Sequence, residues 1–170
     1  MVRRSAALII VAVVLSACAT PFGHSTLAQQ DLNALLVKSG DLPATTQPGQ
    51  VRAGPPPAFN LPTPDRAASE ILSNGMLVVA VYGAQTPRQD AYGRITNAIK
   101  QSAAQNTLPA MSDLGEQSAV YAPVSPGDAA LVTFIRCQAV AFIQLPDTPA
   151  LTSITAYAKR LDSRLKAAVC

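Results

Sequence analysis

The hydrophobic pattern is clearest near the C-terminal end of the sequence, where it repeats with the period of a helix. Between residues 148 and 170, apolar side chains recur at alternating steps of three and four, and most charged side chains fall on the other face. Thr148-Pro149 is typical of a helix start. The apolar positions are Leu151, Ile154, Ala158, Leu161, Leu165 and Ala168. Such a stripe predicts a long helix with one face buried against the protein.

Three further apolar runs have the length and composition of β-strands. Residues 76–82 (MLVVAVY) form a continuous, valine-rich run without polar alternation, which predicts a strand covered on both faces. Residues 131–136 and 139–145 are rich in β-branched and aromatic side chains and are separated by Cys137-Gln138, which predicts a β-hairpin. The turn lacks the glycine or Asn-Gly pair that would fix its type, so its register stays open.

Weaker patterns precede and separate these strands. Residues 27–38 and 65–73 each place apolar side chains at helical spacing ahead of a glycine, which predicts two short helices. Thr86-Pro87-Arg88-Gln89 matches a capping box with proline at the first helical position and predicts the start of a third helix. Residues 106–116 are expected to form a loop, and residues 118–121 a short strand.

These elements together predict an α+β fold in which helices pack against an antiparallel sheet in two or three layers. The compact domain is expected over residues 65–170, preceded by a short helix with its closing turn at residues 27–42. Between them, the Pro-rich segment of residues 43–64 holds seven of the fourteen prolines. Because proline has no N–H for a β-ladder, this segment is expected to lack regular secondary structure and either to lie extended over the surface or to be disordered.

The first seventeen residues have the layout of a signal peptide. Arg3 and Arg4 precede an uncharged apolar run over residues 6–15, the order of charge and hydrophobicity found in secretory signals. The alternative is a retained transmembrane helix. A membrane span needs about 20 apolar residues, more than this run supplies.

The motif Leu15-Ser16-Ala17-Cys18 resembles the lipobox of bacterial lipoproteins. The resemblance implies that residues 1–17 are removed and that Cys18 becomes the lipidated amino terminus, carrying a diacylglyceryl group and often a further acyl chain such as palmitate. Several acyl chains anchor a protein stably, whereas one does so only reversibly. Residues 18–26 are then a tether. The expected location is a bacterial membrane, facing outside the cytoplasm, with the choice of inner or outer membrane left open; ordinary secretion and an uncleaved anchor are the alternatives.

A second resemblance rests on short stretches spread over the chain. They are Leu35-Leu36 with Asp41-Leu42-Pro43, the strand at residues 76–83, residues 114–119 (LGEQSA) and the last helix. Their order is similar to that of compact extracytoplasmic sensor-type domains of bacterial lipoproteins and receptor kinases. The resemblance implies an α+β sensor-type domain, and it implies no particular activity.

Composition narrows the class of partner. Thirteen Lys and Arg stand against ten Asp and Glu, a net charge of +3. Removal of Arg3 and Arg4 with the signal peptide leaves eleven basic and ten acidic residues, a net charge of +1. Nucleic-acid binding needs a concentrated basic surface. No nucleic-acid partner is therefore expected.

The sequence offers little for catalysis or metal binding. The single histidine, His24, lies in the tether, and Cys-x-x-Cys pairs, acidic calcium loops and glycine-rich phosphate loops are missing from the sequence. Ser163-Arg164-Leu165-Lys166 fits the Ser-x-x-Lys pattern of penicillin-binding enzymes, but the accompanying Ser-Asp-Asn and Lys-Thr-Gly motifs are missing too. We therefore expect no enzymatic activity and no cofactor.

Cys137 and Cys170 are the cysteines left once Cys18 is acylated. The strand over residues 138–145 spans about 26 Å at roughly 3.3 Å per residue, and the helix over residues 149–169 returns about 31 Å at 1.5 Å per residue. A helix that runs back along its own sheet therefore brings Cys170 to the hairpin turn. Disulfides persist outside the cytoplasm, so a Cys137–Cys170 bridge is predicted; the alternative is two unpaired thiols.

The leading functional hypothesis is a lipid-anchored extracytoplasmic binding or sensor-type domain without catalytic activity. It would contact membrane lipid through acylated Cys18 and bind a protein partner or a small ligand. The alternative is an accessory structural subunit of a membrane or envelope complex, with the Pro-rich segment wrapping a neighbour. The sequence leaves open whether the space between sheet and helices is filled or contains a pocket.

Overall fold

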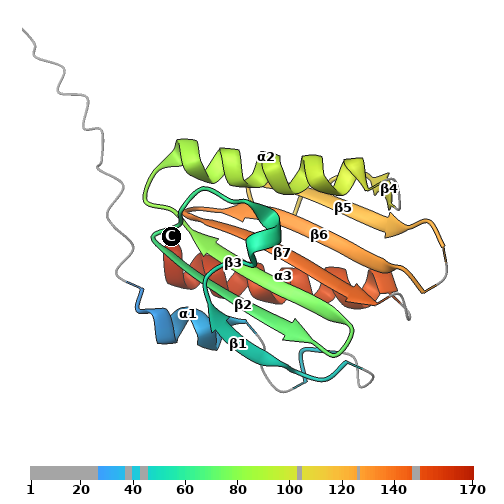
Figure 1. The fold of residues 1–170 in the computed structure, drawn as a ribbon, viewed down its shortest axis with the longest axis horizontal. Coiled ribbons are helices and arrows are strands. Elements are labelled where there is room, and N and C mark those ends of the chain that lie inside the picture. Colours follow the sequence, from blue (N-terminus) through green and yellow to red (C-terminus); the bar gives the residue numbers. More distant parts are fainter. Residues whose placement is uncertain (1–26, 37–39, 43–45, 103–104, 126, 147–149) are drawn as a thin grey trace, which may run out of the picture.

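A sheet of seven strands, all antiparallel to their neighbours, forms the centre of the computed structural model, in the order β1-β2-β3-β7-β6-β5-β4 (Figure 1). The structure describes residues 27–36, 40–42, 46–102, 105–125, 127–146 and 150–170. Its strands are β1 (Gln50–Ala53), β2 (Arg66–Leu72), β3 (Gly75–Val81), β4 (Gln105–Leu108), β5 (Gln117–Pro123), β6 (Ala129–Arg136) and β7 (Ala139–Pro146). Its helices are α1 (Gln29–Leu35), the 3-10 helix η1 (Pro57–Phe59), α2 (Gln85–Gln101) and α3 (Ala150–Val169). The α+β fold with an antiparallel sheet is confirmed.

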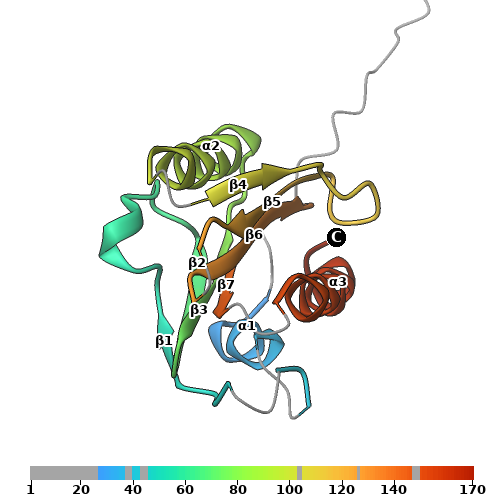
Figure 2. The same ribbon diagram turned by 90° about the vertical axis from the view of Figure 1, so that its right-hand side faces the viewer.

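The sheet is covered on both faces, which makes three layers. Helix α2 lies on one face, and α1 and α3 lie on the other (Figure 2). Successive β3 residues therefore enter different cores: Leu77 and Val79 pack in the α1/α3 core, and Val78 and Ala80 pack in the α2 core. The unbroken valine-rich pattern of this strand follows from that double coverage.

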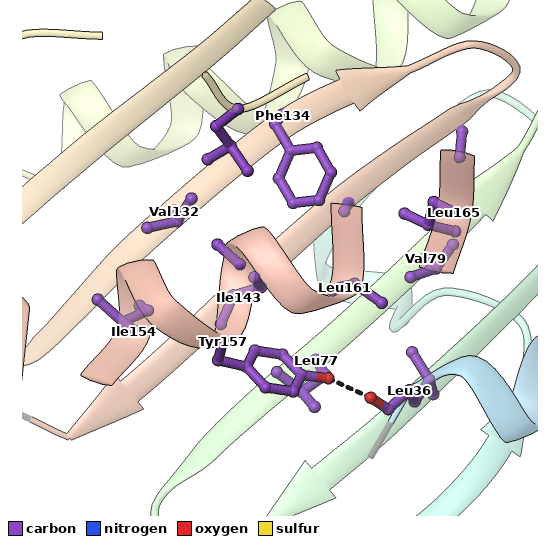
Figure 3. Close-up of a cluster of buried hydrophobic side chains, with 14 of the residues drawn as sticks. Leu36, Leu77, Val79, Val132, Phe134, Ile143, Ile154, Tyr157, Leu161 and Leu165 are labelled. Atoms are coloured by element: carbon purple, nitrogen blue, oxygen red, sulfur yellow. Dashed lines mark hydrogen bonds between the residues drawn. The ribbon is translucent and has the colours of Figure 1, made fainter. Parts of the chain in front are cut away.

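The larger core lies between α3 and the sheet. Ile154, Leu161 and Leu165 of α3 pack with Phe134 and Ile143 of the β6–β7 hairpin (Figure 3). All five side chains are fully buried. The predicted apolar stripe of the last helix is thus confirmed, and it is the element that closes this face of the sheet.

A buried tyrosine connects α1 to this core. The Tyr157 hydroxyl donates a hydrogen bond to the backbone carbonyl of Leu36, at the end of α1 (Figure 3). Burial raises the pKa of Tyr157 far above its usual value, because the charged form would lose its hydration. The phenol therefore stays protonated and keeps its donor.

The helix predicted at residues 65–73 is wrong, because this stretch is strand β2. Ala67 pairs with Ala80, and Ser69 pairs with Val78 of β3. The small side chains of this stretch satisfy a helical stripe and a strand alternation equally well, and pairing with an apolar neighbour decides between them. The tight connection from β2 to β3 is the two-residue turn Ser73-Asn74, and Gly75, which the sequence pattern indicates as the end of a helix, is the first residue of β3 and pairs with Leu72.

The Pro-rich segment also contains regular structure, contrary to prediction. Within residues 46–64, β1 pairs with β2, and η1 places Phe59 against Phe142 with ring centroids 4.9 Å apart. The four residues of β1 include no proline, and the strand lies at the edge of the sheet. The prolines of this segment therefore lie outside the β1–β2 ladder.

Near α2, the start of the helix and the loop that follows it both differ from the prediction. The helix begins at Gln85 with Ala84 as its N-cap and no side-chain capping bond, so the capping box is wrong. Pro87 lies in the first turn, where backbone N–H groups have no partner within the helix. Strand β4 occupies part of the predicted loop at residues 106–116, and it pairs with β5.

The remaining expectations on the described chain are confirmed with small shifts in boundary, namely α1, β5, the β6–β7 hairpin and α3. Among the described residues, no helix is long and apolar enough to cross a membrane. The signal peptide, the lipobox with Cys18 and the tether at residues 18–26 lie outside the described ranges.

Candidate functional site

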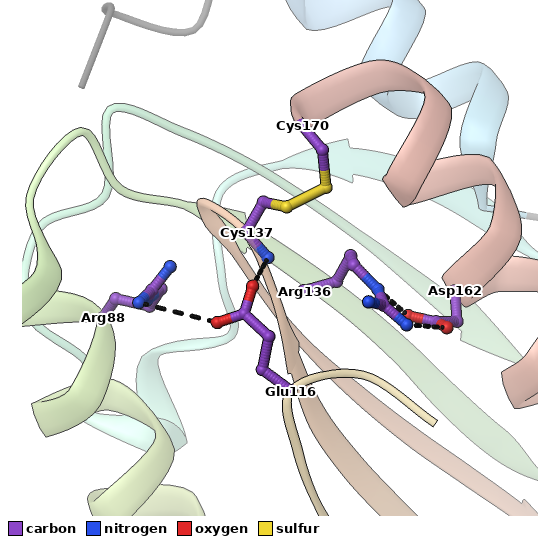
Figure 4. Close-up of a disulfide and its surroundings, with 6 residues drawn as sticks. All are labelled: Arg88, Glu116, Arg136, Cys137, Asp162 and Cys170. Carbon is purple, nitrogen blue, oxygen red and sulfur yellow. Dashed lines mark hydrogen bonds and ion pairs between the residues drawn. A yellow bond between two sulfur atoms is a disulfide. The ribbon is translucent and has the colours of Figure 1, made fainter. Parts of the chain in front are cut away.

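The predicted disulfide between Cys137 and Cys170 is confirmed, with the two Cα atoms 5.4 Å apart (Figure 4). It joins the turn of the β6–β7 hairpin to the end of α3. Cys137 has a φ of +48°, at the first of the two turn residues, a position where glycine is usual in type II′ hairpins. The sheet and α3 are therefore linked at one end of the molecule, as the lengths of the strand and helix predict.

A cavity of about 390 Å³ lies beside this disulfide. Its volume falls within the range of roughly 300 to 1,000 Å³ seen for small-molecule sites. Four parts of the chain converge on it: the start of α2, the loop before β5, the β6–β7 turn and the end of α3. Its lining residues are Gln85, Arg88, Glu116, Cys137, Gln138, Val169 and Cys170. We call this cavity the disulfide pocket.

Arg88 is the most unusual residue of the disulfide pocket. Its side chain is only 8% exposed, yet within the described chain its guanidinium makes no hydrogen bond, and Nε is buried without a partner. Its ion pair with Glu116 is long, at 3.9 Å between Nη2 and Oε2. A guanidinium has five N–H donors, and a buried polar group without hydrogen bonds costs free energy. Arg88 therefore has unused donor capacity at the pocket.

Arg136 provides an internal comparison. Its Nε and Nη2 atoms donate to Oδ1 and Oδ2 of Asp162 at 2.6 and 2.5 Å (Figure 4). These bonds raise the pKa of Arg136 above its usual value. We call this pair closed, because the guanidinium and the carboxylate make two direct hydrogen bonds in bidentate geometry; it connects β6 to α3. We call the Arg88–Glu116 pair open, because its two groups lie 3.9 Å apart and make no direct hydrogen bond.

Glu116 is held in place although its side chain is 47% exposed. Its Oε1 accepts a hydrogen bond from the Cys137 backbone N–H at 2.7 Å, and its own N–H donates to the Ile135 carbonyl at 2.7 Å. Gly115, which precedes it, has a φ of +64°, and a Cβ there would lie 2.3 Å from the Ile135 carbonyl oxygen. Glycine is thus required for the close approach that sets the carboxylate at the pocket rim.

Two helix ends add partial charges of opposite sign. Gln85 is the first residue of α2 and Val169 the last of α3, and both line the pocket. A helix carries partial positive charge at its N-terminus and partial negative charge at its C-terminus. The pocket therefore has a positive side near Arg88 and a negative side near Glu116 and the end of α3.

The cysteine and Ser-x-x-Lys candidates for covalent chemistry are bonded to each other or lie outside the disulfide pocket. Both pocket cysteines are oxidised to the disulfide, and no group of His, Cys, Asp or Glu that could hold a metal occurs in the part of the chain that the structure describes. The Ser-x-x-Lys candidate lies elsewhere: Ser163 is exposed on α3, and its hydroxyl donates to the Lys159 carbonyl. His24 and Cys18 lie outside the described residues.

Sequence reasoning found Cys137 and Cys170 but missed Arg88 and Glu116. The sequence pattern assigns Arg88 to a capping box and Glu116 to a loop. A signal for Arg88 does exist, since it precedes Tyr92 and Ile95 at the four- and seven-residue steps of the apolar face of α2. Charged residues are rarely buried unless they are paired, so a charged residue on an apolar helix face indicates a partner of opposite charge or a bound ligand. Glu116 lies in the stretch 114–119 that carries part of the sensor-domain resemblance, but no hydrophobic pattern marks its carboxylate.

Comparison with known proteins adds no relative. Neither a protein-family model, nor a curated protein, nor a solved structure matches this chain.

Proposed function

We propose that this protein is a lipid-anchored, extracytoplasmic binding domain without catalytic activity, and that its ligand occupies the disulfide pocket. The observation that carries the proposal is the buried Arg88 guanidinium without a hydrogen bond. A buried charge is retained against its desolvation cost when it is paired or when it serves binding. Arg88 is poorly paired, so binding is the better explanation.

Two further observations support the location. The Cys137–Cys170 disulfide is of the kind that persists in oxidising compartments outside the cytoplasm. The signal-peptide layout and the lipobox motif ending at Cys18 supply the expected route and anchor. The proposed membrane contact is through acyl chains on Cys18.

The alternative, a structural subunit whose Pro-rich segment wraps a neighbour, receives less support. Residues 50–53 of that segment pair with β2, and Phe59 packs against Phe142 of the same chain. These backbone and ring contacts are already made within the molecule. A stable complex isolated in mild detergent would favour this alternative.

We expect Arg88→Met to leave the protein as stable as the wild type, or to stabilise it by about 1 kcal/mol. The reason is that a hydrophobic side chain of similar length removes a desolvated charge, while Glu116 stays solvated at 47% exposure. Urea unfolding followed by circular dichroism measures the free energy. The matched control is Arg136→Met, which leaves Asp162 buried and unpaired and is expected to lose about 3 kcal/mol. Equal losses in both variants would make Arg88 a structural cation and overturn the proposal.

Replacement of Cys18 by serine is expected to release the protein from membranes in its native host. Serine cannot accept the thioether-linked lipid, and the acyl chains provide the anchor. Membrane fractionation after a carbonate wash and metabolic labelling with palmitate measure the effect. Ser16→Ala, which keeps a small residue in the lipobox, is the control and should be anchored normally. A Cys18→Ser protein that stays membrane-bound at normal processed length would refute the anchor.

A further inference from the structure

The disulfide pocket offers a ligand one open cation and one open anion side by side. Arg88 Nη2 and Glu116 Oε2 are 3.9 Å apart, too far for a direct hydrogen bond. Neither group is free to move far, since the Arg88 side chain is buried within α2 packing and Glu116 is bonded to the β6–β7 turn. A group that bridges them must accept a hydrogen bond on one side and donate one on the other.

We propose that the disulfide pocket binds its ligand through an uncharged amide group, whose carbonyl oxygen accepts from Arg88 and whose N–H donates to Glu116. This inference rests on the binding function proposed above and names the chemistry of its ligand. An amide carries an acceptor and a donor on adjacent atoms. It therefore matches the adjacent donor and acceptor of the open pair.

Charge argues against the two ionic alternatives. A carboxylate bound to Arg88 lies beside the Glu116 carboxylate, and an ammonium bound to Glu116 lies beside the Arg88 guanidinium. Like charges a few ångströms apart repel strongly in a partly buried site. A neutral amide meets both side chains without such repulsion, and its dipole follows the direction set by the N-terminus of α2 and the C-terminus of α3.

The rest of the lining fits the same ligand class. Gln85 adds a primary amide, which pairs readily with further amide groups. Val169 and the disulfide supply apolar surface in the same pocket. The volume of about 390 Å³ admits a small molecule or a few atoms of a side chain or peptide bond rather than a folded partner.

Three planar probes of nearly equal shape test the inference: acetamide, acetate and acetamidinium, with charges of zero, minus one and plus one. Each is titrated to about 100 mM, because ligands of so few atoms bind weakly, into the full chain purified in mild detergent with its disulfide intact. Backbone amide chemical shifts are followed by NMR. We expect acetamide to shift the signals of Arg88, Glu116 and Cys137 at about fivefold lower concentration than either ion, the effect of one hydrogen bond of about 1 kcal/mol.

Glu116→Gln removes the anion while keeping the size of the side chain, and it should abolish or invert the preference for acetamide over acetate. The control is Asp113→Asn, which removes the same charge from an exposed pair with Lys159, 2.7 Å apart and outside the pocket lining. It should leave the order of the probes unchanged. In a further arm, N-methylacetamide binding more tightly than acetamide identifies a peptide bond as the source of the amide, and the reverse identifies a primary amide.

The possible failures are distinct. Acetate binding best to the wild type would overturn the amide inference and leave the proposed binding function standing. Shifts that spread away from the pocket, or no shift with any probe, would also overturn the amide inference. The binding function itself falls only if Arg88→Met destabilises the protein as strongly as Arg136→Met.

Discussion

Replacing both Cys137 and Cys170 by serine is expected to lower the free energy of unfolding by about 4 kcal/mol. The bridge closes a loop with a sequence separation of 33 residues, and in the chain-entropy model the main effect is to restrict the unfolded chain. For a domain of this size that is a large fraction of a total stability of roughly 5 to 15 kcal/mol. The end of α3 and the β6–β7 turn should lose protection from amide exchange first.

Guanidinium unfolding of the wild type and of the double variant measures this effect, each with and without dithiothreitol. The reductant should bring the wild type to the midpoint of the double variant and leave the variant itself unchanged. The double variant should also show a steeper dependence on denaturant, since its unfolded state is less compact. Identical midpoints for the oxidised wild type and the double variant would contradict the prediction.

Phe134→Ala is expected to lower the free energy of unfolding by about 4 kcal/mol, which is within the range for truncation of a large aromatic side chain in a core. The Phe134 ring is 0% exposed and lies between the sheet and α3, where it packs with Leu161 and Leu165 (Figure 3). Its removal leaves a cavity that the disulfide-linked α3 cannot easily collapse into. The same core holds Tyr157, so the link from α3 to α1 should weaken as well.

Urea unfolding measures this loss against a matched truncation at the surface. Val124 is 54% exposed, and Val124→Ala should change the free energy by no more than about 0.5 kcal/mol. Phe134→Leu, which keeps most of the buried volume, should fall between the two. A loss below about 1 kcal/mol for Phe134→Ala would show that the core near α3 is loosely packed.

The elements that the sequence predicted correctly are those whose burial is decided by their own pattern. The apolar residues of α3 recur with the period of a helix, and β3 is apolar along most of its length. The two strands of the β6–β7 hairpin are separated by a turn of only two residues. The disulfide followed from the same elements, because a strand and a helix of similar length return the chain to its starting point. In these cases, local pattern and tertiary environment agree.

The elements that were missed depend on neighbours that are remote in sequence. β2 is a strand because β3 pairs with it. β4 is a polar edge strand, Gln105-Asn106-Thr107-Leu108, whose residues show no alternation of apolar and polar side chains. An edge strand of this kind takes its structure from its neighbour β5, so its own composition carries little information.

The disulfide pocket could not be predicted from the sequence for a similar reason. Arg88 and Glu116 come from separate elements, and a Gly115 turn against Ile135 brings the carboxylate to the guanidinium. The sequence shows where the arginines are. It does not show whether an arginine is hydrogen-bonded to a carboxylate, like Arg136, or lies too far from one, like Arg88, because that depends on the distance between the two groups. Only the three-dimensional structure supplies that distance.

The pairing of β3 with β7 sets the order in which this chain can fold. Leu77 lies opposite Ile143, so the middle of the sheet joins a strand from the first half of the sequence to one near its end. During synthesis, β1, β2 and β3 emerge well before β7. The valine-rich β3 therefore has one edge unpaired until β7 has been made. Long-range contacts of this kind slow folding, because the intervening chain must be ordered before they form. The sheet is completed only after residue 146 has been made, and α3 then covers it, so the exposed edge of β3 is the part of the nascent chain most in need of protection from aggregation.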